Sequence, residues 1–418
     1  MKVNQHSLGL RFLDIVSIVP QNYRKICEYF IQLVPLVVIS IIISYHRQSF
    51  LDQQVGNRPV FDLLLAGAVL APWLAQACCM PLYIELGQEI YVNGKIRTAS
   101  MLYHLIRKNL YAPLILTTLG GLLFRTFYPV PWMFTLSLIL ICFCQVLFSQ
   151  FMVLPLTLKR FDIWLLSWGG YFLALAIFPQ LWFLPPLSGI IVIILVAPKS
   201  TGEKAFKTSK RNYMFWLLCG LIVGLILWFD KVTFYLLQKE QTNPLYIFIS
   251  LIPSLLALNY FYIFRLPQLE KVLTNTISSI NNKSIQHYLE WKNYTYLLVK
   301  QTFFEILGLL VFFSCISCTM AIVAEKMDWK MVLLTHLLTL FMTIITVIFN
   351  TLLLLRAFSL FFKMAAALFF FFLLVVWRGQ DQMIFFEHYL MAFCYIAFMF
   401  VLMARRKWKR PHLSYFSN

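Results

Sequence analysis

Runs of about twenty apolar residues, separated by short polar segments, recur along the whole chain. A helix needs roughly 20 mainly apolar residues to cross the hydrocarbon core of a bilayer, so these runs predict membrane-spanning helices. Only Pro179-Gln180 separates the short fifth and sixth runs, and we expect a tight hairpin there, with a re-entrant pair as the alternative. The pattern predicts twelve spans, over residues 26–45, 60–84, 110–128, 130–154, 163–178, 181–197, 214–229, 245–264, 303–324, 331–355, 358–377 and 384–404.

The composition supports the same class of protein. Of the 418 residues, 61% are hydrophobic and 12% are charged, whereas soluble domains are about 45–50% apolar and about 25% charged. These values exclude an ordinary soluble domain, a disordered chain, a coiled coil, a collagen and a disulfide scaffold. The net charge of +18 belongs to the ends of the spans, so we expect no nucleic-acid binding. The sequence therefore predicts an all-α polytopic membrane protein.

Lysine and arginine are distributed unevenly around the predicted spans. With a cytoplasmic N-terminus, 27 of the 35 Lys and Arg lie in segments on the cytoplasmic side. Short cytoplasmic loops are enriched in Lys and Arg, so the distribution predicts that both termini are cytoplasmic. The inside segments are 1–25, 85–109, 155–162, 198–213, 265–302, 356–363 and 405–418, and the basic residues left outside are Arg47, Arg58, Arg125, Lys231, Lys239, Lys326, Lys330 and Arg378.

The basic segment 199–213 divides the spans into six and six. We therefore expect an N-terminal six-helix lobe over 1–198, a C-terminal lobe over 214–404 and a basic cytoplasmic tail over 405–418. Equal halves around a central basic linker are common in transporters that contain internal repeats. Within the cytoplasmic segment 265–302, an apolar stripe at helical spacing predicts an amphipathic helix at the membrane interface; the stripe is Leu269, Val272, Leu273, Ile277 and Ile280.

Ionisable residues inside spans are expensive, so they are the first candidates for function. Each also has an ordinary explanation, as an interfacial anchor for the acids and Arg125 and as a packing residue for the histidines. Prolines such as Pro253 kink helices, and broken helices often line transport cavities. The candidates for a transport cavity are Asp62, Arg125, Glu305, Pro253, Asp230 and Lys231, with His336, Glu387 and His388 as weaker ones.

Other chemistry receives little support. Cys315 and Cys318 form a CxxC motif, but it lies within a span and lacks a second cysteine pair, so we interpret it as apolar packing and expect no metal or other cofactor. The first 25 residues lead into a full-length span, which argues against a cleavable signal peptide. No GxxxxGK[ST] motif is present, so transport would need an ion gradient, a partner or a downhill substrate gradient.

Three short motifs resemble PelG-type proteins, the inner-membrane polysaccharide transporters of Pel systems. The segment Trp228-Phe229-Asp230-Lys231 followed by Phe234-Tyr235 is similar to the end of one of their spans, and 249–254 is similar to the Pro-containing core of the next. The loop 89–95 is similar to the short acidic loop after their second span. The resemblance extends over about half of the chain and is carried by short motifs of this kind.

The resemblance implies membership of the multidrug/oligosaccharide-lipid/polysaccharide flippase superfamily, with two six-helix lobes around a central cavity. It further implies export of an amino-sugar-rich exopolysaccharide across a bacterial inner membrane during biofilm formation, and no enzymatic activity. The implied partners are membrane lipids and the glycosyltransferase and cyclic-di-GMP receptor components of an export complex. Because Asp230-Lys231 is the feature most like the family, we expect Asp230 at an outer gate, with Arg125 as a candidate partner.

Two alternatives remain open. A major-facilitator transporter also has twelve spans, but Tyr91 occupies the position where its loop motif, here Gly87, Gly94 and Lys95, requires an aspartate. A membrane-bound polysaccharide O-acyltransferase would use an intramembrane histidine such as His336 as general base, although no second catalytic group is evident.

The predicted topology is directly testable with reporter fusions. Fusions at Gln53, Gln241 and Gln380 should report the outside, and fusions at Gly202, Asn282 and Ser414 the cytoplasm. Opposite sides for Gly202 and Asn282 would contradict both the number of spans and the two-lobe organisation.

Overall fold

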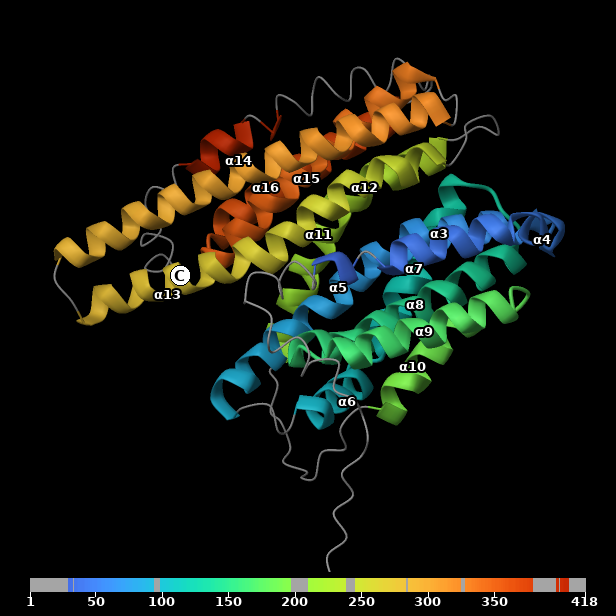
Figure 1. Ribbon diagram of the computed structural model, residues 1–418, viewed down its shortest axis with the longest axis horizontal. Helices are drawn as coiled ribbons and strands as arrows, with labels where there is room; N and C mark the ends of the chain where they lie inside the picture. Colours follow the sequence, from blue (N-terminus) through green and yellow to red (C-terminus); the bar gives the residue numbers. More distant parts are fainter. Residues whose placement is uncertain are drawn as a thin grey trace, which may run out of the picture.

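A computed structural model describes residues 29–32, 34–93, 98–196, 210–237, 245–282, 285–324, 328–378, 396–397 and 399–405. This part of the chain is helical apart from one short β-hairpin (Figure 1). The elements are α3 (Val34–Tyr45), α4 (Arg47–Asp52), β1 (Gln54–Val55), β2 (Arg58–Pro59), α5 (Val60–Asn93), α6 (Thr98–Lys108), α7 (Tyr111–Phe127), α8 (Trp132–Leu158), α9 (Phe161–Ile177), α10 (Leu184–Val196), α11 (Lys210–Leu237), α12 (Leu245–Tyr260), the π-helical turn η1 (Phe261–Arg265), α13 (Leu266–Asn282), α14 (Ile285–Ala324), α15 (Trp329–Leu354) and α16 (Phe358–Arg378).

The apolar helices confirm a multi-pass membrane protein. Among the described residues, six helices are long and apolar enough to cross a membrane, and the bent pair α6–α7 makes a seventh if it forms one span. The bend of 49° lies at the break between Lys108 and Tyr111. Shorter apolar helices cover Phe161–Ile177, Leu184–Val196 and Phe358–Phe371, where three further spans were expected. Most of the last expected span, 384–404, lies outside the described residues.

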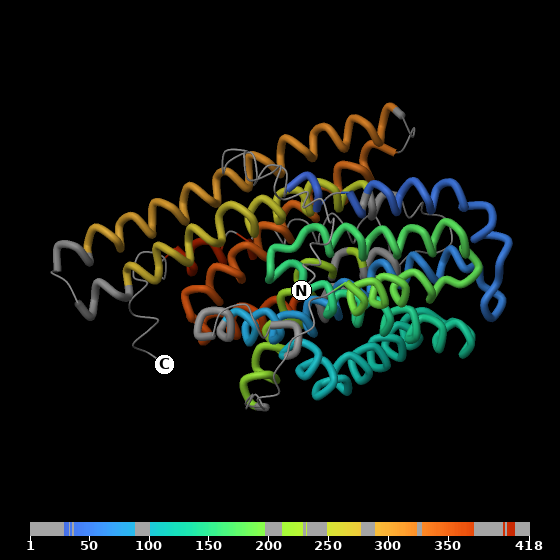
Figure 2. Tube along the Cα trace, turned by 60° about the horizontal axis from the view of Figure 1, so that its bottom comes forward, coloured from blue at the N-terminus to red at the C-terminus, as the bar shows by residue number. Residues whose placement is uncertain are grey.

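Successive long helices run in opposite directions between two ends of the molecule, one at α4 and one at α13 (Figures 1 and 2). Gly121 of α7 faces Ile139 of α8 across a short connection, so these two helices form an antiparallel hairpin. Helix α5 runs parallel to α8, because Gly67 lies against Ile141 and Gln150 donates a hydrogen bond to the Cys78 carbonyl.

A small hairpin closes the α4 end. Strands β1 and β2 pair in antiparallel register through Gly56 and Asn57, which both have positive φ angles (57° and 65°). Two positive φ values identify a type I′ turn, which matches the twist of two-residue hairpins. A side chain at position 56 would meet Pro131 and Met133, so the turn packs directly on the start of α8.

Helix α11 joins the two halves of the chain. It lies antiparallel on α5 at glycine distance, because a Cβ on Gly220 would stand 2.7 Å from the Gln76 carbonyl oxygen and one on Gly224 2.8 Å from that of Trp73. Small residues four positions apart allow membrane helices to approach this closely. The indole nitrogen of Trp73 also donates a hydrogen bond to the Leu221 carbonyl, at 3.1 Å.

One three-helix arrangement occurs in both halves. In the second half, α12 runs parallel to α15, since Ser250 contacts Thr339 and Ser254 contacts Thr343. Helix α14 is antiparallel to both, as α7 is to α5 and α8. The arrangement thus repeats as α5–α7–α8 and α12–α14–α15.

The turn that follows each third helix is also the same. Lys159 after α8 and Arg356 after α15 both adopt positive φ (56° and 53°). The hydrogen bonds correspond one by one: Lys159 N–H to Leu156 and Arg160 N–H to Pro155 match Arg356 N–H to Leu353 and Ala357 N–H to Leu352. This is the Schellman motif, here with a basic residue where glycine is usual. All four positions are shifted by a constant number of residues, so the two turns are equivalent points of a repeat.

Helices α13 and α14 form an arm beyond the other helices (Figures 1 and 2). The 40 residues of α14 span about 60 Å, twice the thickness of a hydrocarbon core. The predicted amphipathic helix is present as α13, but Leu269, Val272 and Leu273 of its apolar stripe are buried, and the helix packs on α14. This part of the stripe therefore has a protein partner rather than the membrane interface that we expected.

Adding one methyl group at the α5–α11 contact should destabilise the protein. Gly220→Ala places a Cβ within 3 Å of backbone atoms of Gln76 and Ala77, and overpacking of this kind costs about 1–3 kcal/mol. Gly308→Ala in α14 is the matched control, because a Cβ there meets nothing within 4 Å. We expect Gly220→Ala to lower the midpoint of thermal unfolding in detergent and Gly308→Ala to leave it unchanged or raise it. Equal midpoints for the two variants would contradict the close contact.

Candidate functional site

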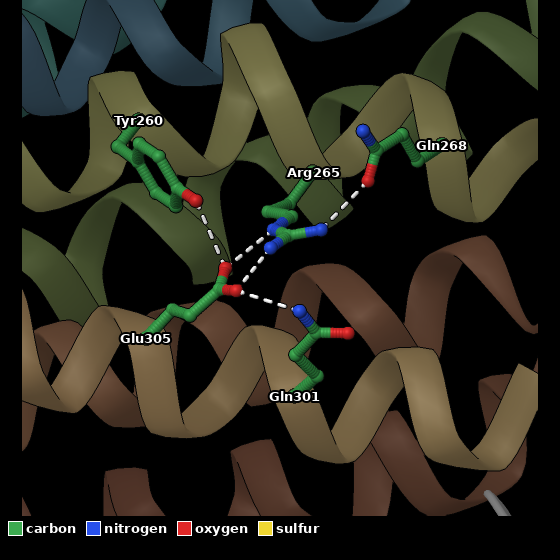
Figure 3. A network of polar contacts seen from close by, with 5 residues as sticks. All are labelled: Tyr260, Arg265, Gln268, Gln301 and Glu305. Atoms are coloured by element: carbon green, nitrogen blue, oxygen red, sulfur yellow. Dashed lines mark hydrogen bonds and ion pairs between the residues drawn. The ribbon is translucent and has the colours of Figure 1, made fainter.

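The strongest polar cluster of the described spans joins Arg265 to Glu305 (Figure 3). The Arg265 guanidinium makes a two-pronged contact, with Nε donating to Oε2 at 2.5 Å and Nη2 donating to Oε1. Tyr260 Oη and Gln301 Nε2 donate to the same carboxylate, each at 2.9 Å. Four donors therefore surround Glu305, and the two charged side chains are only 13% and 28% exposed.

The π-helical turn η1 brings two of these donors onto one face of their helix. Tyr260 and Arg265 are five residues apart, and in an α-helix they would point about 140° away from each other. A π turn closes its hydrogen bonds over five residues, as in the bond from Leu266 N–H to the Phe261 carbonyl, so the two side chains come nearly into line. The turn lies directly before Pro267, which has no N–H and whose ring clashes with the carbonyl four residues earlier.

The cluster connects three helices of the second half. Arg265 Nη1 also donates to Gln268 Oε1 of α13 at 2.8 Å, while Gln301 and Glu305 lie one turn apart on α14. Within the π turn, Tyr262 is hydrogen-bonded to the Asn350 side chain of α15. A displacement of α14 relative to α12 would thus break several polar contacts together.

This arrangement suits a mechanical role better than catalysis. All four hydrogen bonds to Glu305 stabilise the ionised carboxylate. In the described part of the chain, no group of three or more His, Cys, Asp and Glu side chains is placed to hold a metal ion. An ion pair with two-pronged geometry holds helices in one arrangement and releases them when either partner moves away.

Two other predicted residues belong to the α4 end of the first half. Arg125 donates from Nη1 to the Val130 carbonyl at 2.8 Å, and its guanidinium lies 3.8 Å from the centre of the Trp132 ring. Both contacts lie within the α7–α8 hairpin, so Arg125 stabilises its own turn. Asp62 is half-buried in the first turn of α5 and interacts with Arg58.

Two predicted residues, Asp230 and Lys231, lie near the end of α11. Lys231 is 1% exposed, and its Nζ donates to the Leu227 carbonyl at 3.2 Å. A lysine that anchors a helix at the membrane interface extends toward the headgroups, whereas this side chain is buried in the protein. The side chain of Asp230 lies outside the described part, and its predicted pairing with Arg125 stays a prediction.

The remaining predicted residues are Pro253, His336, Glu387 and His388. Pro253 is a buried residue inside α12. His336 is 4% exposed in α15, and its Nε2 lies 3.0 Å from Ser317 Oγ of α14. Cys315 and Cys318 are both free thiols on α14, one exposed and one half-buried. Glu387 and His388 lie outside the described residues.

Sequence reasoning identified Glu305 but missed Arg265 and Tyr260. Arg265 was counted among the basic residues of a cytoplasmic segment, whereas the structure places it in a helix that continues α12. The 40 residues between the partners leave no local pattern that indicates the pair. The sequence contains one signal of an irregular helix there: Pro267, which follows the π turn after one intervening residue.

Removing the charge of Glu305 should weaken the packing of α12 on α14. Glu305→Gln leaves Arg265 half-buried without its counter-charge, and we expect a loss of about 2 kcal/mol, between the values for exposed and for buried pairs. The matched control is Asp162→Asn, because the Arg160–Asp162 pair is local and its side chains are 43% and 35% exposed. Thermal unfolding of Glu305→Gln, Arg265→Gln and the double variant measures the coupling, which should exceed that of the control pair. A coupling no larger than the control's would contradict the role of the cluster.

Comparisons with protein-family models, with curated proteins and with solved structures found no match for this chain. The function must therefore be inferred from the chain's own residues and their contacts.

Proposed function

We propose that the protein is a membrane transporter composed of two six-helix repeats, which exports an exopolysaccharide across a bacterial cytoplasmic membrane. The observation that carries this proposal is the repeated three-helix arrangement with its equivalent turns at Lys159 and Arg356. Parallel repeats of this kind are frequent in secondary transporters, whose substrate site lies between the halves. In this proposal the site lies where α11 crosses from the second half onto α5.

The repeats also agree with the orientation proposed from charge. The turns at Lys159 and Arg356 lie at the α13 end, as does the arm formed by α13 and α14. All three belong to the segments that the distribution of Lys and Arg assigns to the cytoplasm. The α4 end, which carries the β-hairpin, is then the outer side, and both termini are cytoplasmic.

The Arg265–Glu305 cluster is proposed as a latch near the cytoplasmic side of the second repeat. It holds α14 on α12 at the level where the arm leaves the bundle, and its partners come from helices that an opening motion would separate. An irregular helix next to Pro267 supplies a place at which such a motion can bend the chain. Opening would exchange the four donors of Glu305 for water.

The nature of the substrate rests on the resemblance to PelG-type proteins through Trp228–Lys231, 249–254 and 89–95. An amino-sugar-rich polymer and cytoplasmic glycosyltransferase and cyclic-di-GMP receptor partners follow from it. The basic cytoplasmic segments favour such acidic or nucleotide-regulated partners on that side. Adjacent genes for these partners would support the proposal independently.

Deleting the gene in its native cell separates the transporter from the acyltransferase alternative. We expect polymer synthesis to continue while export is lost, because synthesis and translocation use different proteins in this proposal. Wild-type protein and the Asp162→Asn control should restore export, whereas Glu305→Gln should restore it less well at equal protein abundance. Normal export that lacks only O-acyl groups would overturn the transporter, and a major-facilitator carrier would leave export of the polymer intact.

A further inference from the structure

Ser317 lies between two other buried polar groups, the Ile249 carbonyl and the His336 ring. Together these groups need more hydrogen-bond donors than a neutral ring can supply. Ser317 Oγ lies 2.9 Å from the Ile249 carbonyl oxygen of α12 and 3.0 Å from His336 Nε2 of α15. His336 Nδ1 in turn lies 2.7 Å from the Val332 carbonyl oxygen. Ser317 is 7% exposed and His336 4%, so water does not complete the set.

Pro253 determines where the Ser317 hydrogen atom goes. In an α-helix the Ile249 carbonyl accepts its hydrogen bond from the N–H of residue 253, and a proline there has none. The Ile249 oxygen is therefore left without its helical donor, inside a span where an unsatisfied carbonyl is costly. The Ser317 hydroxyl supplies that donor. A hydroxyl has one hydrogen atom, so Ser317 presents only lone pairs to His336.

The histidine then needs a hydrogen atom on both ring nitrogens. A carbonyl oxygen only accepts, so the contact with Val332 requires Nδ1–H, and the contact with the occupied Ser317 hydroxyl requires Nε2–H. A neutral imidazole carries one of these hydrogen atoms and leaves one of the three contacts without a donor. Only the imidazolium satisfies all three, and these hydrogen bonds offset the free energy that burial of its charge costs.

We propose that His336 is a proton-binding site whose charged form fastens α12 to α14 and α15 through Ser317 and the carbonyl that Pro253 leaves free. Binding transfers one proton from hydronium to the ring: one O–H bond breaks, one N–H bond forms on Nε2, and a water molecule is released. The coupling role rests on the transporter proposed above: in that transporter, this site would make the proton the coupling ion. His336 lies seven residues into α15, about 11 Å along the helix from the α4 end, so the proton would enter from the proposed outer side.

The surroundings of the ring contain few groups that compete for this role. Titratable groups on α15 and on the helices that pack on it include Asp328 and Lys330 at the start of α15, Cys315 and Cys318 of α14, Lys231 of α11 and Lys363 of α16. Described neighbours on α12 are Ile249 and Ser250, which do not titrate.

The protonation of the ring can be observed directly by nitrogen NMR of the full-length protein, labelled with ¹⁵N-histidine in lipid nanodiscs. The chain has seven histidines, and His336→Gln identifies the signals of His336. We expect both ring nitrogens to become protonated as the pH is lowered. A ring that stays neutral down to about pH 5 would overturn the proposal.

Two variants test whether the number of hydrogen-bond donors around Ser317 determines the protonation of His336. Ser317→Ala removes the acceptor of Nε2–H, and Pro253→Ala returns an N–H to Ile249 and frees the serine hydrogen for a neutral ring. Each should lower the midpoint by about one pH unit, the equivalent of one hydrogen bond to a charged group. The matched control is Thr319→Ala, which removes an exposed hydroxyl bonded to its own helix and should leave the midpoint unchanged. A midpoint that is the same in all three variants would overturn the proposal.

The readout does not depend on the substrate. A ring that titrates as expected in a protein whose deletion leaves polymer export intact would keep the proton site and reject polysaccharide transport. Lost export together with a ring that stays neutral would reject the proton site and keep the transporter.

Discussion

Every backbone carbonyl inside a bilayer must find its donor within the protein, and the irregular features of this structure follow from that constraint. Pro253 removes one donor, and Ser317 of the neighbouring helix replaces it. Before Pro267 the helix widens into a π turn, which restores the chain of backbone hydrogen bonds with one more residue per turn. After α8 and α15 the last carbonyls bond to the N–H groups of tight turns. Ser317 and His336 lie at the first of these repairs, and Tyr260 and Arg265 at the second.

The contact of α11 with α5 determines how the two halves come together. Gly220 and Gly224 allow backbone-to-backbone approach, and the bond from Trp73 to the Leu221 carbonyl fixes the rotation of one helix on the other. Because lipid tails are as apolar as the helices, close packing and such bonds replace the hydrophobic effect as the source of association. Through α11, which also packs on α15, this contact joins the first three-helix unit to the second half.

Three of the charged groups on the apolar helices are accommodated in different ways. Arg125 bonds within its own hairpin, Lys231 folds back onto its own helix, and Arg265 pairs with Glu305. The Arg265–Glu305 pair differs because its two residues are 40 positions apart in the sequence and belong to different helices. Like the contacts of Ser317, it changes if α14 moves relative to α12.

The sequence by itself determined the class of protein, the positions of most spans and the two ends at which they turn, because hydropathy and helix length act locally. It also indicated Glu305, Pro253 and His336, because charges and prolines in apolar runs stand out. Only the tertiary structure decided that Glu305 faces Arg265, that Lys231 is buried and that Ser317 contacts both His336 and the Ile249 carbonyl. Those contacts depend on the rotation of each helix, and a single π turn at 261–265 shifts that rotation for everything beyond it.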